Sequence, residues 1–146
     1  MCHKDTAKED IMNKLEKMVR THYDGLESGD LDLSLSVFDP AVETVTPSGV
    51  MQGVDEFRAF GQTFLDAVSG GRHEVRNTVE VDDTIVVEGT YSGTHTGDLA
   101  GPGGTIPATG REFSFPYCDV LQARDDLFVA HRIYWDNAAF VAQLTG

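Results

Sequence analysis

The hydrophobic pattern of this chain changes its period near residue 71, and the change limits the folds that the sequence can adopt. Before it, apolar residues recur at the three- and four-residue spacing of amphipathic helices. After it, apolar and polar residues alternate, as in strands with one buried face. Helices followed by long strands predict an α+β fold. With 146 residues, 40% of them hydrophobic, the chain suits a single domain over residues 1–146.

The first helix is predicted from both its ends and its interior. Residues 6–9 form a capping box, and apolar residues continue at helical spacing over about residues 7–28. Gly29 is the expected stop, because glycine readily adopts the left-handed conformation that ends a helix. A short second helix is expected from Leu31, although the alternation of its leucines also fits a strand.

Extended structure is predicted at residues 41–46, and a third helix from Gly53 to a stop at Gly70-Gly71. Long strands then follow at 72–81, 84–96, 111–123 and 127–135. The Gly/Pro-rich residues 97–110 form a loop that either covers a cavity or is only a mobile turn, and residues 137–144 form a short helix or hooked tail. The pattern predicts one strongly bent antiparallel sheet, with three helices across its concave face that enclose a pocket.

The charge distribution excludes several classes of partner. Residues 1–20 carry five basic and four acidic side chains, whereas the rest of the chain carries six basic and twenty acidic ones. Such an acidic body has no basic stripe for nucleic acid or for anionic membranes, and it favours a neutral, apolar ligand. No apolar run approaches the ~20 residues of a membrane span, and no signal peptide is visible. We therefore expect a cytoplasmic protein, with Cys2 and Cys118 as free thiols.

No metal or cofactor is expected. None of the five histidines is paired with another at metal-ligand spacing on a helix, and no cysteine accompanies them. There is also no nucleotide-binding glycine motif and no Gly-x-Ser-x-Gly elbow for a nucleophilic serine.

The last predicted strand carries the first candidate for chemistry. Alternation separates its end into two sets, Arg132, Tyr134 and Asp136 on one face and His131, Ile133 and Trp135 on the other. If Asp136 lies among apolar groups, desolvation raises its pKa and it can transfer protons near neutral pH. The alternative is that Asp136 only caps the terminal helix.

A second candidate, His95, follows a strand face that also carries Tyr91. A histidine at this place either stabilises a bend of the sheet or polarises a carbonyl in a cavity. Aromatic side chains are candidates to bind substrate, although each could instead fill the core: Phe57, Phe60, Phe64, Tyr91, Tyr117 and Trp135.

Short motifs in the second half resemble the SnoaL-like polyketide cyclases of the nuclear-transport-factor-2-like superfamily. They are Gly93-Thr-His-Thr-Gly97, Thr109-Gly110-Arg111, and Tyr134-Trp-Asp136 followed by Gln143-Leu144. The resemblance implies a cone-shaped α+β barrel with a hydrophobic pocket. It also implies cofactor-independent ring closure, with Asp136 as general acid/base and with Tyr134 and His95 orienting the substrate carbonyl.

Two relatives of that superfamily match less well. In ketosteroid isomerases the catalytic aspartate would fall on Thr46. In limonene-type epoxide hydrolases an Arg and an Asp would fall on Gly89 and Tyr91, although their last-strand aspartate matches Asp136. The resemblance therefore predicts a cyclase, isomerase or lyase acting on a small apolar carbonyl compound. An epoxide hydrolase-like enzyme, a module that binds a hydrophobic ligand, and a domain that forms homodimers through its sheet remain alternatives.

Overall fold

The computed structural model describes residues 6–146, and it describes side chains from residue 14 onward. The elements in this range are α1 (Thr6–Ser28), α2 (Leu31–Leu35), β1 (Phe38–Thr46), β2 (Gly49–Gln52), α3 (Val54–Ala67), β3 (Val68–Val81), β4 (Thr84–His95), β5 (Leu99–Gly101), β6 (Gly104–Ile106), β7 (Glu112–Arg124), β8 (Leu127–Trp135) and α4 (Asn137–Thr145). The predicted α+β class is confirmed. Cys2, His3 and the side chains of the capping box lie outside the described residues.

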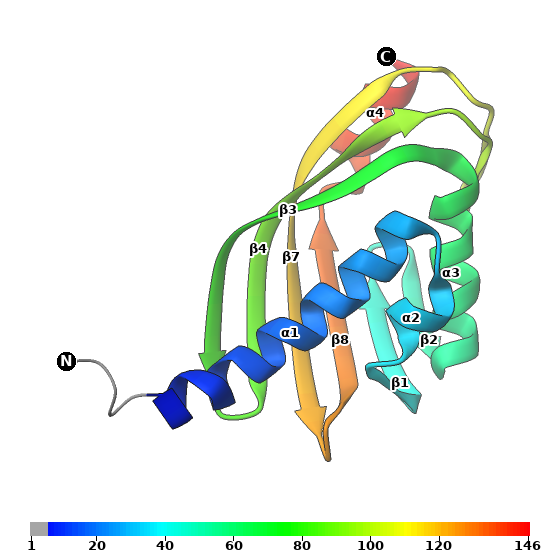
Figure 1. The fold of residues 1–146 in the computed structure, drawn as a ribbon. Helices are drawn as coiled ribbons and strands as arrows, with labels where there is room; N and C mark the ends of the chain where they lie inside the picture. The colour runs from blue at the N-terminus through cyan, green and yellow to red at the C-terminus, as the bar shows by residue number, and fades with distance from the viewer. Residues whose placement is uncertain (1–5) are drawn as a thin grey trace.

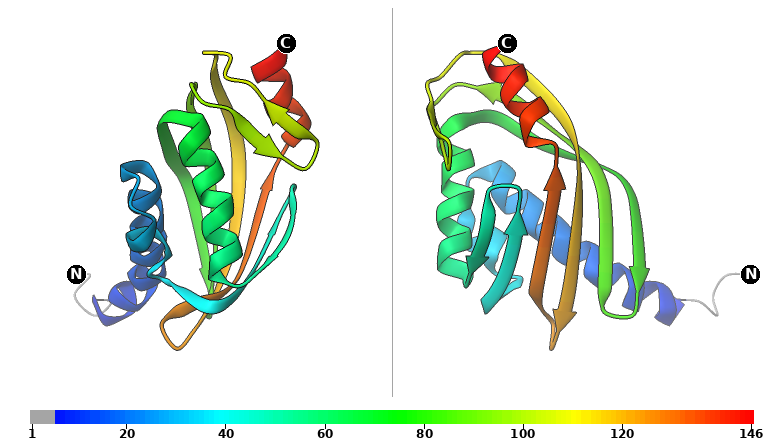
Figure 2. Two further views of the ribbon diagram at one scale, coloured as in Figure 1. Left: turned by 90° about the vertical axis from the view of Figure 1, so that its right-hand side faces the viewer. Right: turned by 180° about the vertical axis from the view of Figure 1, so that it is seen from behind.

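The main sheet has six strands in the order β2-β1-β8-β7-β4-β3. Its long strands bend over α1, which lies across the concave face, while α3 runs along one side (Figures 1 and 2). Neighbouring strands are antiparallel except β1 and β8, which are parallel. The prediction of a purely antiparallel sheet is therefore wrong at this one junction.

The curved sheet does not close into the cone-shaped barrel that the resemblance implied. Among the described residues, β2 and β3 are edge strands, each paired with a single neighbour. The chain passes from one edge to the other through α3, so a helix stands where a closed barrel would have strand pairing. Helices α1 and α3 instead cover the open concave face with their apolar sides.

Most predicted boundaries agree with the structure, and 127–135 has the same bounds as β8. The third helix is an exception, because it ends at Ala67 instead of Gly70-Gly71. Val68 is already extended and pairs with His95 of β4, so the strand starts before the glycines. The predicted loop 97–110 contains the small hairpin β5–β6.

Two glycines make room for tyrosines beneath the helices. A Cβ atom at Gly89 would lie 2.7 Å from the Tyr117 hydroxyl oxygen and 2.6 Å from the Glu74 carbonyl oxygen. A Cβ at Gly71 would lie 2.9 Å from the Tyr91 hydroxyl oxygen. These positions are closer than real Cβ contacts, so the sequence leaves space for both phenol rings on the concave face.

Candidate functional site

A cavity of about 480 Å³ lies between the concave face of the sheet and helices α1 and α3. This volume falls within the range of about 300–1,000 Å³ found for ligand sites. All six aromatic residues that the sequence offered as substrate contacts line the cavity: Phe57, Phe60, Phe64, Tyr91, Tyr117 and Trp135.

Asp136 lies outside this cavity. Its side chain is the N-cap of α4, where it accepts a hydrogen bond of 3.0 Å from the backbone N–H of Ala139, and the residue is exposed. Tyr134 is 50% exposed. The reason is alternation along β8, which turns His131, Ile133 and Trp135 toward the cavity and leaves the other set outside. Asp136 therefore caps α4, as the alternative interpretation predicts. The prediction that Asp136 and Tyr134 lie in the site is wrong.

His95 is fully buried but does not line the cavity. Its Nδ1 atom lies 2.9 Å from the hydroxyl of Thr109, and its backbone carbonyl accepts from Gly110. These contacts fasten the end of the 97–110 segment to the end of β4. His95 therefore supports the bend of the sheet, as the structural alternative predicts, and does not face the cavity.

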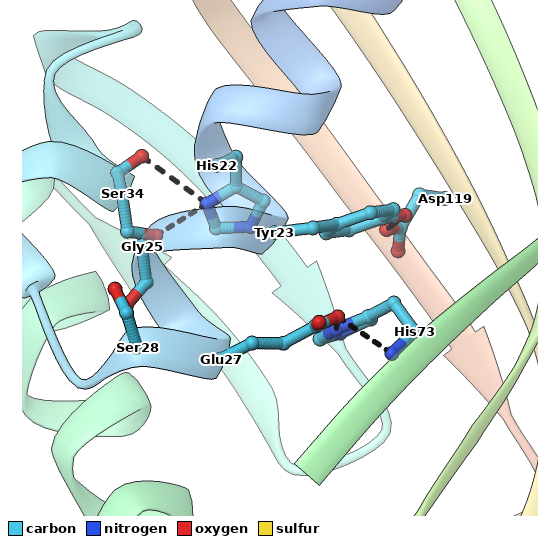
Figure 3. Close-up of polar contacts among 8 residues, drawn as sticks. All are labelled: His22, Tyr23, Gly25, Glu27, Ser28, Ser34, His73 and Asp119. Atoms are coloured by element: carbon cyan, nitrogen blue, oxygen red, sulfur yellow. Dashed lines mark hydrogen bonds and ion pairs between the residues drawn. The ribbon is translucent and has the colours of Figure 1, made fainter.

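A buried polar cluster occupies the cavity wall instead, and we call His22, Tyr23, Asp119 and His131 the buried quartet. The Tyr23 hydroxyl donates to Oδ2 of Asp119 at 2.5 Å, and Nε2 of His131 lies 3.5 Å from Oδ1 (Figure 3 draws three of the four). Asp119 is 4% exposed and His131 is fully buried. Within the described part of the chain, Oδ1 accepts no hydrogen bond.

The surroundings of Asp119 keep it ionised. Burial acts to raise the pKa of this carboxyl, but the interaction with His131 and the hydrogen bond from Tyr23 outweigh it, so the pKa lies below its ordinary value. Burial, followed by the nearby Asp119 charge, raises the pKa of Tyr23 well above its ordinary value. The tyrosine therefore stays protonated and the aspartate stays a base at neutral pH.

His22 lies beside this pair in a neutral state. Its Nδ1 atom lies 2.7 Å from the hydroxyl oxygen of Ser34, and its ring is edge-on to that of His131 at 5.8 Å (centroid to centroid). Burial, followed by repulsion from His131, lowers the pKa of His22 to about 3. The ring thus fills the apolar wall without adding charge.

A second carboxylate–histidine pair lies toward the exposed end of the cavity. Oε2 of Glu27 accepts the backbone N–H of His73 at 2.7 Å and lies 3.2 Å from its Nδ1. The His73 ring stacks on Tyr23 at 4.1 Å and 6° (Figure 3). We call Glu27 and His73 the outer pair, since the Glu27 side chain is 32% exposed and that of His73 13%.

The family of this chain follows from comparison with known proteins. The family model of the SnoaL-like polyketide cyclases matches residues 16–144. The chain belongs to this family. No curated protein sequence matches it.

Solved structures share the fold of this SnoaL-like chain. TsrD from Streptomyces laurentii is 24% identical, with a TM-score of 0.78 over 90% of this chain and 94% of its own. An NTF2-like protein of unknown function from Burkholderia pseudomallei is 21% identical, with a TM-score of 0.75 over 91% and 98%. TerC, co-crystallised with polyporic acid, is 20% identical, with a TM-score of 0.75 over 91% and 99%.

Sequence reasoning missed the buried quartet of this SnoaL-like domain, although three of its members, His22, Asp119 and His131, left a signal. Asp119 continues an inward-facing series with Phe113, Phe115, Tyr117 and Leu121 on β7. His22 occupies an apolar position of α1, and His131 shares the cavity face of β8 with Trp135. A polar residue in an apolar series is costly to bury without partners, which makes it a candidate for function.

Two further observations concern the described residues. Among residues 14–146, no group of three or more His, Cys, Asp or Glu side chains is arranged to hold a metal ion. No helix in the described part of the chain is long and apolar enough to cross a membrane. What the site offers is an ionised buried carboxylate, protonated phenols and neutral imidazole in an apolar cavity.

Proposed function

We propose that this SnoaL-like protein catalyses cofactor-independent proton transfer on a small apolar carbonyl compound of polyketide type, as a cyclase or isomerase. The observation that carries the proposal is the Asp119 carboxylate, 4% exposed at the cavity wall, with Oδ1 left without a hydrogen bond. Asp119 takes the role of general acid/base that the sequence first suggested for Asp136.

In the proposed reaction, Oδ1 of Asp119 removes a proton from the carbon next to the substrate carbonyl. The C–H electron pair forms an enolate, whose oxygen accepts a hydrogen bond from the Tyr117 hydroxyl. That hydroxyl is buried without a partner among the described residues, and burial raises its pKa, so it stays a donor. In an isomerase the enolate regains the proton at another carbon; in a cyclase it attacks a second carbonyl and forms a C–C bond.

The substrate class is proposed from the cavity lining. Aromatic and aliphatic side chains supply most of the wall, and its carboxylates, Glu27, Asp66 and Asp119, would repel an anion. Such a lining favours an apolar, ring-containing ligand over an anion. TerC, a protein of the same fold, was co-crystallised with polyporic acid.

The proposal is tested by deuterium exchange at the α carbon of 2-tetralone, an apolar bicyclic ketone, in D₂O followed by NMR. Binding is measured separately through the fluorescence of Trp135, which lines the cavity and is the only tryptophan of the chain. We expect Asp119→Asn to bind 2-tetralone within a few-fold of wild type and to lose about 10²-fold or more in exchange rate.

Other results would decide against the proposal. Unchanged exchange in Asp119→Asn would show that this carboxylate is not the base. Binding by the wild type without exchange above that of acetate buffer would favour the alternative of a module that only binds a hydrophobic ligand.

A further inference from the structure

The outer pair is arranged as a proton-transfer unit of its own. Glu27 comes from the last turn of α1 and His73 from the first half of β3, so two distant segments meet here. The Glu27 carboxylate accepts the backbone N–H of His73 and faces Nδ1 of the ring. Because an ionised carboxylate only accepts hydrogen bonds, Nδ1 is the donor, and Nε2 is the ring atom that can exchange a proton.

The Tyr23 side chain contacts both His73 of the outer pair and Asp119. The ring of Tyr23 stacks on His73 at 4.1 Å, while its hydroxyl donates to Asp119 at 2.5 Å. Both Glu27 and His73 line the same cavity as Asp119. Tyr117, the proposed donor to the substrate oxygen, is 5.6 Å from His73 between ring centroids.

We propose that His73, oriented by Glu27, is the second acid/base of this site and exchanges a proton with the substrate oxygen that Tyr117 binds. This inference rests on the proposed function. The imidazolium Nε2–H bond breaks as the O–H bond forms on the enolate or alkoxide oxygen, and neutral imidazole remains. Water at the exposed end of the cavity then returns a proton to His73. The buried Asp119 is less accessible to this water.

The titratable and charged groups around His73 determine how a pH profile of the exchange rate is interpreted. They are His22, Tyr23 and Glu27 from α1, Tyr91 from β4, Tyr117 from β7, and the neighbouring Arg72 and Glu74 in β3. Burial raises the pKa of Tyr91 and Tyr117, so the phenols do not titrate near neutral pH. A hydrogen bond with His73 lowers the pKa of Glu27, so that carboxyl stays ionised there.

The test uses the 2-tetralone exchange assay from pH 5 to 9 with the variants His73→Asn and Glu27→Gln. His73→Asn keeps an amide near the Nδ1 position but cannot carry the proton. We expect its exchange rate to fall about 10²-fold, with Trp135-monitored binding within a few-fold of wild type. We expect the wild-type rate to decline toward high pH and the His73→Asn rate to show no such decline.

Glu27→Gln tests the positioning role and keeps an acceptor for the His73 backbone. Its high-pH decline should move to lower pH, because the carboxylate no longer stabilises the protonated ring. Glu74→Gln, an exposed neighbour of His73 on β3, is the matched control and should behave as wild type.

Wild-type rates and profiles in both His73→Asn and Glu27→Gln would overturn the inference. If Asp119→Asn loses exchange and these variants do not, the proposed function stands and the inference alone falls. A loss of rate with an unchanged pH profile in Glu27→Gln would also contradict it, because that is the result of a merely structural role.

Discussion

Lowering the pH from 7.5 to 5 should destabilise the protein through His22. Its pKa is about 3 in the folded state because burial, followed by His131, disfavours the charged ring. In the unfolded chain a histidine titrates near 6.5, so below that pH the unfolded state binds a proton that the folded state does not. Each pH unit below 6.5 then costs about 1.4 kcal/mol, which amounts to about 2 kcal/mol at pH 5.

The variant His22→Asn isolates this effect, since its side-chain amide can either accept from or donate to Ser34. At pH 7.5 the variant should be less stable than wild type by about 1–3 kcal/mol, because part of a buried ring is lost. Urea unfolding at both pH values should show that the difference between the two proteins shrinks by about 2 kcal/mol at pH 5. The lowered pKa of Asp119 costs stability only below its ordinary value of 3.8, outside this window. A difference that stays constant with pH would refute this account of His22.

Three other predictions concern the cavity and the sheet. Gly89→Ala should lower the free energy of unfolding by about 1–3 kcal/mol, because the new methyl group would meet the Tyr117 hydroxyl and the Glu74 carbonyl; an unchanged melting curve would contradict the close packing. Tyr117→Phe should bind 2-tetralone within a few-fold of wild type but exchange it about 10²-fold more slowly, and equal rates would remove Tyr117 from the mechanism. The homodimer proposed from the sequence should sediment as a dimer and dissociate in Tyr134→Asp, whereas a monomeric wild type would refute it.

Local patterns predicted the elements well, because each depends on neighbouring residues. Alternation over 127–135 set both ends of β8, and it also separated Trp135 from Tyr134 and Asp136. The predicted site nevertheless combined residues from both faces of β8. Because only one face of the strand meets the cavity, Trp135 and Asp136 cannot both line it. The alternation itself was predicted correctly, but the face that carries Asp136 lies away from the cavity.

The rest depends on contacts between distant segments. Tyr23 meets Asp119 only when α1 lies across β7, and Glu27 meets His73 only when α1 reaches β3. No local spacing relates these residues, although Asp119 stood in an otherwise apolar, inward-facing series of β7. The open edge of the sheet likewise depends on α3 connecting β2 to β3, which strand counting does not predict.

Comparison of Asp119→Asn with Asp136→Asn in the 2-tetralone exchange assay tests the central claim most directly. Both variants remove one carboxylate, and asparagine still caps a helix at position 136. We predict exchange within about twofold of wild type for Asp136→Asn and a loss of about 10²-fold or more for Asp119→Asn. The reverse order of the two rates would contradict the assignment of proton transfer to the buried carboxylate.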